Sequence, residues 1–207
     1  MNMASSKRSD IALLILAAGE SKRMGQAKQL LPWGETTLLG QALEQALKTP
    51  ITRKYLLLGA RAEHIMQEVD LTGFIPLINP DWEEGMGTGI AFATRKMLND
   101  LPDLKGVLIM LADQPEVNSD LLTAMLDQFD ASEMPVLACA YEKKAGVPAI
   151  ISGAHMKQLT SFQGDTGARK LFKTISDQLE LFELNESLQD IDDPETYRRL
   201  HDSYFKP

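Results

Sequence analysis

Residues 11–28 read IALLILAAGESKRMGQAK, and this stretch decides the expected fold class. Its first six residues, Ile11–Leu16, are all apolar, which is typical of a strand buried on both faces of a parallel sheet. The loop that follows contains Gly19 and Gly25, where backbone N–H groups can approach a ligand closely. The same loop carries three cations, Lys22, Arg23 and Lys28. Backbone donors and cations on one loop are the parts of a cradle for a triphosphate.

Two common glycine-rich loops do not fit this stretch. The ATPase P-loop ends in Gly-Lys-Ser/Thr, whereas Gly25 is followed by Gln26. Gly19 and Gly25 are also wrongly spaced for the dinucleotide-binding fingerprint. On residue types alone, an ordinary strand-to-helix turn with solvated basic side chains remains the alternative.

Apolar runs and helix-period segments alternate along the rest of the chain. Further strands are expected at Tyr55–Leu58, Phe74–Ile78, Val107–Leu111 and Val136–Ala140, with helices at Thr37–Lys48, Ala62–Val69, Ile90–Asn99 and Asp120–Phe129. This alternation predicts a three-layer α/β/α fold, with a mostly parallel sheet and helices on both faces. Later elements are expected at Ser152–Gln158 and Gly167–Ile175 (helices), Leu179–Leu184 (a strand) and from Pro194 (a helix). One domain over residues 1–207 is the simplest account, with residues 1–10 as a flexible N-terminus.

Composition and charge narrow the class of ligand. Hydrophobic residues make up 44% and charged residues 24% of the chain, as in soluble globular domains. The net charge of −8 disfavours nucleic-acid binding, yet residues 1–30 hold five basic and two acidic residues. A single cysteine excludes an internal disulfide, and no apolar run is long enough to span a membrane, so the cytoplasm is the expected location. An acidic protein with a local basic loop fits a small anionic ligand.

Two further loops lie where ligands collect in open parallel sheets, beyond the carboxyl ends of strands. Asp113 follows the predicted strand at Val107–Leu111, and Mg²⁺ prefers one or two carboxylates together with phosphate oxygens. The alternative is a carboxylate that satisfies the backbone of its turn. Asn79 and the glycines at 85, 87 and 89 follow the third strand and predict a flexible loop that leads into a helix N-terminus, which attracts anions. A plain loop and helix cap is the alternative there.

Residues 16–34 resemble the signature loop of the nucleotidyltransferases that include molybdenum cofactor guanylyl- and cytidylyltransferases. The matching residues are Leu16-Ala17-Ala18-Gly19, Arg23-Met24-Gly25, Lys28 and Leu30-Leu31-Pro32-Trp33-Gly34. The resemblance implies a Rossmann-like fold of the nucleotide-diphospho-sugar transferase type. It also implies that the nucleotide is bound by Leu16, Ala17, Ala18, Gly19, Arg23, Lys28, Asn79, Gly85 and Asp113. Among these, Arg23, Lys28 and Asp113 would be catalytic.

The resemblance extends to the second half of the chain. Gly146-Val147-Pro148 and Gly164–Arg169 match the family, which implies an acceptor site with Gly146, Pro148, Asp165 and Arg169. The turn Asp190–Glu195 resembles a late D-x-P-E turn, and its alignment points to Asp192 as a second metal ligand beside Asp113. Asp190 is the substitute candidate. A helix cap at Asp165 and a solvated acidic turn at 190–195 are the respective alternatives. The family's usual serines are replaced here by Gly87-Thr88-Gly89.

The family's reaction gives the expected function. It is Mg²⁺-dependent transfer of CMP from CTP to the terminal phosphate of molybdopterin or the molybdenum cofactor, with release of pyrophosphate. A molybdoenzyme or its chaperone is a possible partner, whereas no nucleic acid and no membrane is expected. The alternatives are a guanylyl or sugar-phosphate transferase of the same fold and a non-catalytic nucleotide-binding cofactor chaperone.

Overall fold

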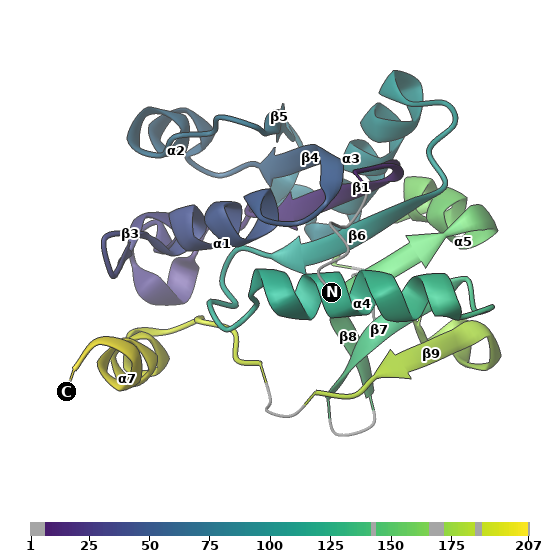
Figure 1. Cartoon of the computed structure of the whole chain (residues 1–207). Helices are drawn as coiled ribbons and strands as arrows, with labels where there is room; N and C mark the ends of the chain where they lie inside the picture. Colours follow the sequence, from purple (N-terminus) through teal and green to yellow (C-terminus); the bar gives the residue numbers. More distant parts are fainter. Residues whose placement is uncertain (1–6, 142–143, 166–171, 185–187, 207) are drawn as a thin grey trace.

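The computed structural model describes residues 7–141, 144–165, 172–184 and 188–206. A seven-stranded sheet in the order β5-β4-β1-β6-β8-β7-β9 runs through its centre (Figure 1). The strands are β1 (Arg8–Leu16), β4 (Ile51–Leu58), β5 (Ile75–Ile78), β6 (Gly106–Leu111), β7 (Val136–Tyr141), β8 (Lys144–Ser152) and β9 (Leu179–Phe182). Neighbouring strands are parallel except where β8 pairs with β6 and β7, so the mostly parallel sheet is confirmed.

Helices cover both faces of the sheet because its strands are apolar on both sides. One face packs against α1 (Leu38–Leu47), α2 (Ala62–Glu68) and α4 (Ser119–Ala131). The other face packs against α3 (Met86–Asp100) and α5 (Gly153–Gln158). Alternate residues of β1 serve the two layers: Ile11, Leu13 and Ile15 face the first, and Ala12, Leu14 and Leu16 the second. The predicted three-layer arrangement is therefore confirmed.

The end of the chain packs separately from these two layers. The last helix, α7 (Pro194–Phe205), begins with the predicted proline, and Asp193 caps it by accepting from the backbone N–H groups of Glu195 and Thr196. The helix lies against a short hairpin of β2 (Pro32–Trp33) and β3 (Thr36–Thr37). The Tyr197 hydroxyl donates to the carbonyl oxygen of Pro32 over 2.8 Å. The hairpin and the terminal helix thus enclose the cluster that holds the turn at 190–193.

β8 was not predicted. Gly146 and Pro148 lie inside this strand and not in a free loop after a parallel strand. The pairing of β7 with β8 passes from Ala138–Ala149 to Cys139–Gly146, which leaves a bulge around Pro148. Because a bulged residue is outside the regular ladder, a proline is tolerated there. Proline and glycine both disfavour a regular strand, so the sequence pattern did not indicate β8.

Three elements begin at least three residues earlier than predicted. β4 starts at Ile51, four residues before the predicted Tyr55. β1 starts at Arg8, so residues 8–10 belong to the sheet and not to the flexible segment expected over residues 1–10. A guanidinium nitrogen of Arg8 donates to both carboxylate oxygens of Asp130 over 2.8 Å, which ties this end of β1 to α4. α3 starts at Met86, so most of the predicted glycine-rich loop is its first turn. A side chain at Gly89 would lie 3.0 Å from Leu57, so glycine permits close packing of this turn on β4.

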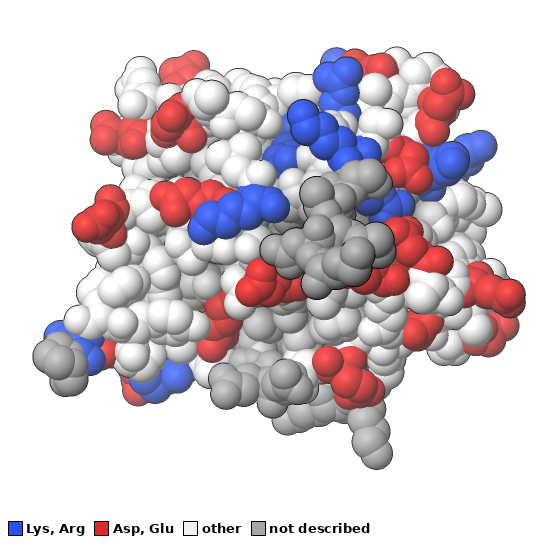
Figure 2. All heavy atoms as spheres, in the orientation of Figure 1, with Lys and Arg blue, Asp and Glu red and all other residues white. Residues whose placement is uncertain are grey.

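The remaining sequence expectations have mixed outcomes. The helix predicted over Ser152–Gln158 is confirmed as α5, which begins one residue later, at Gly153. β9 ends at Phe182, two residues before its predicted end. The helix predicted over residues 167–175 lies largely outside the described residues. No helix in the described ranges combines the length and apolarity needed to cross a bilayer. On the face drawn in Figure 2, Lys and Arg side chains gather in the upper middle, and Asp and Glu side chains are spread more widely.

The topology places a ligand site at the carboxyl end of β1. The chain adds β4 and β5 on one side of β1 and then returns to add β6 on the other side, so the strand order changes direction there. Ligands bind outside the carboxyl ends of strands at such a switch point. A later segment reaches the same place, because the backbone N–H of Ile191 donates to the carbonyl oxygen of Asp113 over 2.9 Å. Ile191 is fully buried with Met24, Leu31, Trp33, Leu38 and Leu200.

Ile191→Ala tests whether this buried side chain holds the late turn in place. We expect the free energy of unfolding in urea to fall by about 2–5 kcal/mol, because the change removes buried methylene groups and leaves a cavity. Ile191→Val is the matched control and should lose only about 0.5–1.5 kcal/mol. Equal stabilities for the two variants would contradict a tightly packed Ile191.

Candidate active site

A cleft of about 900 Å³ opens at the carboxyl ends of the parallel strands. The predicted residues that line it are Leu16, Ala17, Ala18, Gly19, Arg23, Lys28, Asn79, Gly85, Asp113, Asp165 and Asp192. The substitute candidate Asp190 lines it as well. Gly146 and Pro148 are not among the described lining residues, and Arg169 lies outside the described part of the chain. The structure thus gathers residues from loops far apart in the sequence.

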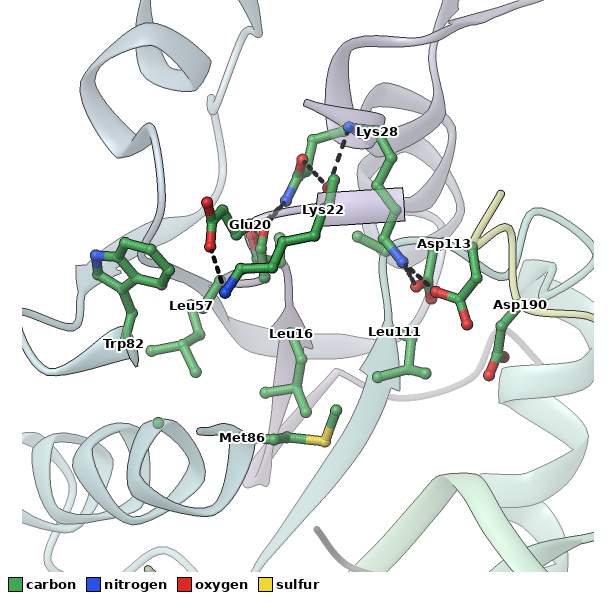
Figure 3. Close-up of a pocket in the computed structure, with 18 of the residues that line it drawn as sticks. Leu16, Glu20, Lys22, Lys28, Leu57, Trp82, Met86, Leu111, Asp113 and Asp190 are labelled. Atoms are coloured by element: carbon green, nitrogen blue, oxygen red, sulfur yellow. Dashed lines mark hydrogen bonds and ion pairs between the residues drawn. The ribbon is translucent and has the colours of Figure 1, made fainter. Parts of the chain in front are cut away.

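The predicted basic loop approaches the predicted carboxylates directly. The Lys28 ammonium donates to Asp113 Oδ2 and, over 2.9 Å, to Asp192 Oδ1 (Figure 3 labels Lys28 and Asp113). Arg23 reaches the other oxygen of Asp192 over 2.8 Å. The Lys28 and Asp113 side chains are only 15% and 14% exposed, whereas Arg23 is 68% exposed. Lys28 and Asp113 therefore form a shielded ion pair, and Arg23 marks the solvent side of the cleft.

Burial and charge shift the pKa values of these groups. Burial raises the pKa of Asp113, and the carboxylates of Asp190 and Asp192 act in the same direction, while the Lys28 ammonium opposes them. Burial disfavours charged Lys28, but attraction to Asp113 and Asp192 outweighs it and raises the pKa of Lys28. For Asp192, burial is outweighed by Lys28 and Arg23, which lower its pKa. Burial thus has the largest influence on the pKa of Asp113, and the Lys28 ammonium only partly offsets it.

Asp113 has the features of a ligand for a divalent cation. Its Oδ1 atom is buried and has no hydrogen-bond partner among the described residues. A buried carboxylate oxygen normally has a partner, so this oxygen is available to a cation. The described residues do not bring three acidic or metal-binding side chains into one tight cage. The free Asp113 oxygen suits a divalent cation that completes its shell with phosphate oxygens and water.

Asp190 is held by a glutamine that the sequence analysis did not single out. Gln114 is buried, and its Nε2 atom donates to Asp190 Oδ1 over 2.8 Å and to the Tyr141 hydroxyl over 3.1 Å. That hydroxyl donates to the carbonyl oxygen of Val147 over 2.5 Å. Val147, which lies between the predicted acceptor residues Gly146 and Pro148, is therefore linked to the carboxylate cluster through hydrogen bonds. Asp190 is oriented toward this link, and Asp192 toward Lys28.

Apolar side chains form the remaining walls of the cleft. Leu16 and Leu111 come from the ends of β1 and β6, and Leu57, Trp82 and Met86 lie on the side of β4 and α3 (Figure 3). Of these five, only Leu16 was named among the expected site residues. A cleft with apolar walls and a few converging polar groups is typical of a small-molecule site. The walls suit a planar base, and the charged end suits phosphates.

Gly85 and Asn79 have specific positions beside these walls. Gly85 adopts a φ of 103°, and a side chain there would lie 2.5 Å from Asp165 Oδ1. Glycine therefore permits the segment that contains Asp165 to close on the start of α3. Asn79 is buried, and its Oδ1 accepts from the backbone N–H of Asp81 over 3.2 Å. Its Nδ2 donor has no hydrogen-bond partner among the described residues and is available to a ligand.

The loop after β1 has a support that the sequence analysis also missed. Gln29 is 3% exposed, and its Nε2 atom donates to the carbonyl oxygens of Ala17 (2.8 Å) and Gly19 (3.1 Å). Its Oε1 atom accepts from the Ser21 hydroxyl over 3.4 Å. Nothing in the spacing of the sequence indicated these partners, because Gln29 reaches them only after the loop has folded back. The loop is thus bound to the turn that carries Lys28.

A protein-family model described as "MobA-like NTP transferase domain" matches residues 13–181. Purine catabolism protein PucB of Bacillus subtilis (strain 168) is 30% identical over 198 residues, which cover 89% of this chain and 92% of the relative. Nicotine blue oxidoreductase of Paenarthrobacter nicotinovorans is 28% identical over 204 residues, covering 90% and 94%. Molybdenum cofactor cytidylyltransferase of Escherichia coli (strain K12) is 36% identical over 86 residues, covering 41% and 44%.

Solved structures share this fold over almost the whole chain. Rv0371c of Mycobacterium tuberculosis H37Rv, in complex with manganese, superposes with a TM-score of 0.80 at 28% identity, covering 94% of this chain and 100% of the other. A nucleotidyl transferase of Methanothermobacter thermautotroptrophicus superposes with a TM-score of 0.79 at 17% identity, covering 95% and 98%. The second likeness shows the fold alone. The expected nucleotidyltransferase fold is confirmed by these structures.

Lys28→Met tests the charge balance of the cluster. The change leaves Asp113 and Asp192 facing each other without the ammonium, so we expect the free energy of unfolding to fall by about 1–3 kcal/mol. This is less than for a fully buried pair, because Asp192 is partly exposed. Mn²⁺ or Mg²⁺ should raise the unfolding midpoint of the variant more than that of the wild type, because a dication can replace the lost charge.

Lys22→Met is the matched control, because Lys22 is 81% exposed and its pair with Glu20 spans 3.2 Å at the surface. Its stability should change by no more than about 0.5 kcal/mol. Equal effects of the two substitutions on stability would contradict the structural role assigned to Lys28.

Proposed function

The chain belongs to the MobA-like NTP transferase family, and from that premise we propose that it transfers CMP from CTP to the terminal phosphate of molybdopterin or the molybdenum cofactor. Pyrophosphate is the second product. The observation that carries the proposal is the convergence of the basic loop after β1 on Asp113 and Asp192 in one cleft. A nucleoside triphosphate complexed with a divalent cation has the complementary charges.

The assignment of CTP and of the molybdenum cofactor as substrates rests on the signature residues and on one relative. Leu16-Ala17-Ala18-Gly19 resembles the loop of the cytidylyl branch, whereas the loop of the guanylyl branch resembles Leu-Ala-Gly-Gly. The turn Ala112-Asp113-Gln114-Pro115 is similar to the metal-binding turn of the cytidylyl branch. The similar E. coli protein is a molybdenum cofactor cytidylyltransferase, although the similarity spans less than half of each chain. PucB and nicotine blue oxidoreductase match over longer stretches, so the choice of acceptor must be tested directly. A molybdoenzyme or its chaperone is a proposed recipient of the product.

The proposed reaction is an in-line displacement that needs positioning and charge more than a protein nucleophile. The acceptor oxygen attacks the α-phosphorus of the nucleotide, and pyrophosphate leaves. Asp113 and Asp192 would hold Mg²⁺, which when bound supplies positive charge at the phosphates. Arg23 and Lys28 stabilise the charge that builds up on the leaving pyrophosphate. Lys28 is already at the carboxylate pair, so a phosphate bound beside Asp113 lies within its reach.

The acceptor binds on the β8 side of the cleft in this proposal. Asp165, also proposed for the acceptor, lines the cleft at the start of α3, where it lies against Gly85. Gly146 and Pro148 do not line the cleft, so their proposed role is indirect. The Tyr141 ring packs on Gly146, and the Tyr141 hydroxyl is linked through Gln114 to Asp190. Arg169 is proposed as a contact to the acceptor phosphate. The opposite side, with Asn79 and Trp82, is left for the nucleoside.

Asp113→Asn should abolish transfer while sparing the fold. An amide keeps the shape of the side chain but removes the charge that binds a dication, so pyrophosphate release should fall by about 10²-fold or more. The unfolding midpoint should change little, because Lys28 keeps its pair with Asp192. Full Mg²⁺-dependent activity in Asp113→Asn, together with its loss in Asp192→Asn, would show that the late turn holds the main metal ligand.

CTP should be preferred over GTP in a competition assay that measures which nucleotide is transferred. The methyl group of Ala18 narrows the nucleotide pocket relative to the glycine of the guanylyl branch, and one methyl is worth about 1–3 kcal/mol of discrimination. Ala18→Gly should therefore shift the ratio toward GTP. Predominant GMP transfer by the wild type would remove the cytidylyl assignment and leave the fold and the reaction class unchanged.

A further inference from the structure

We propose that Gln29 is a positioning residue for the nucleotide. Its side chain holds the backbone of the loop after β1 so that the N–H groups of the loop face the phosphates. This inference rests on the proposed function and adds a residue to it. Gln29 has no role in the charge cluster, yet it is almost completely buried directly below the loop. Its amide makes three hydrogen bonds, all to residues 17–21.

The direction of these bonds fixes the direction of the peptide groups. Gln29 Nε2 binds the carbonyl oxygens of Ala17 and Gly19. In a trans peptide the C=O and the following N–H point in opposite directions. The N–H groups of Ala18 and Glu20 therefore point away from Gln29. Ala18 and Glu20 both line the cleft, so these two donors are available to an anion bound there.

The same glutamine also sets the loop against Lys28. Gln29 follows Lys28 in a single 3-10 turn, Lys28–Leu30. The Ser21 hydroxyl donates to Gln29 Oε1, and the same hydroxyl oxygen, Oγ, accepts from the backbone N–H of Lys28 over 3.3 Å. Ser21 itself has a φ of 62°, a left-handed conformation that a non-glycine residue adopts only when its surroundings hold it there. One turn thus fixes both the backbone donors and the ammonium.

Only an amide satisfies all three partners. A leucine of similar size would leave two carbonyl oxygens without their donor. A glutamate keeps the length, but its ionised form only accepts hydrogen bonds and would repel both carbonyl oxygens. Its protonated form can donate one bond again. Gln29→Glu should therefore bind nucleotide poorly when ionised and recover partly when protonated, which a purely space-filling role would not produce.

The test measures the dissociation constant of Mg²⁺–CTP and the KM and kcat for CTP between about pH 5.5 and pH 8, relative to wild type at each pH. At about pH 8 Gln29→Glu should bind CTP on the order of 10- to 100-fold more weakly. Burial raises the pKa of a carboxyl group at this position above its ordinary value, because Gln29 is almost completely buried. The deficit should therefore shrink as the pH falls for Gln29→Glu and stay constant for Gln29→Leu. Ser21→Ala, which removes one partner, should show a smaller loss of about 2- to 5-fold.

Gln45→Leu is the matched control. Gln45 Oε1 accepts a hydrogen bond from the backbone N–H of Ser119 over 3.1 Å, which links α1 to α4. Gln45 is not among the residues that line the cleft. This variant should lose stability but bind CTP within about 2-fold of wild type. Wild-type affinity in Gln29→Glu, or a deficit that does not change with pH, would overturn the inference alone. A wild type that binds neither CTP nor GTP would overturn the proposed function and the inference with it.

Discussion

One shielded ammonium holds together two carboxylates that lie far apart in the sequence. Lys28 is 85 residues from Asp113 and 164 residues from Asp192, and it donates to both. This contact requires that β1 and β6 be neighbours, so that their carboxyl ends meet, and that the turn before α7 be tied to Asp113 through Ile191. Because separated charges in a shielded place are costly unless they are paired, the fold and the site are stabilised by the same interaction.

Much of the fold was predictable, since the first five predicted strands are apolar runs and the helices between them have clear periodicity. The failures have physical causes. β8 contains Gly146 and Pro148, which read as a turn, yet Gly146 pairs with Cys139, a bulge accommodates Pro148, and the strand pairs on both sides. The first turn of α3 contains Gly87 and Gly89, which disfavour helix locally, yet close packing on β4 outweighs their low propensity. In both places tertiary contacts override local preference.

The charged residues of the cleft could be predicted because a charged side chain directly after a buried strand indicates a ligand site. Gln29 and Gln114 were given no role of their own, because the function of a buried glutamine depends on hydrogen-bond partners that the sequence does not reveal. Their partners lie 8 to 12 and 27 to 76 residues away along the chain. The resemblance to the family pointed to Asp192, whereas composition alone would have treated the acidic turn as solvated surface. The neutral residues that orient the charged side chains of this site could not be identified from the sequence alone.

The measurement that tests the account most directly is a crystal structure with Mn²⁺ and CTP, with the metal located by its anomalous scattering. The account predicts one strong peak in contact with the Asp113 carboxylate, with Asp192 as the second carboxylate and the Lys28 ammonium moved onto a phosphate oxygen. It also predicts the triphosphate over the N–H groups of Ala18 and Glu20. A nucleotide bound elsewhere, with Lys28 still between the two carboxylates, would contradict it.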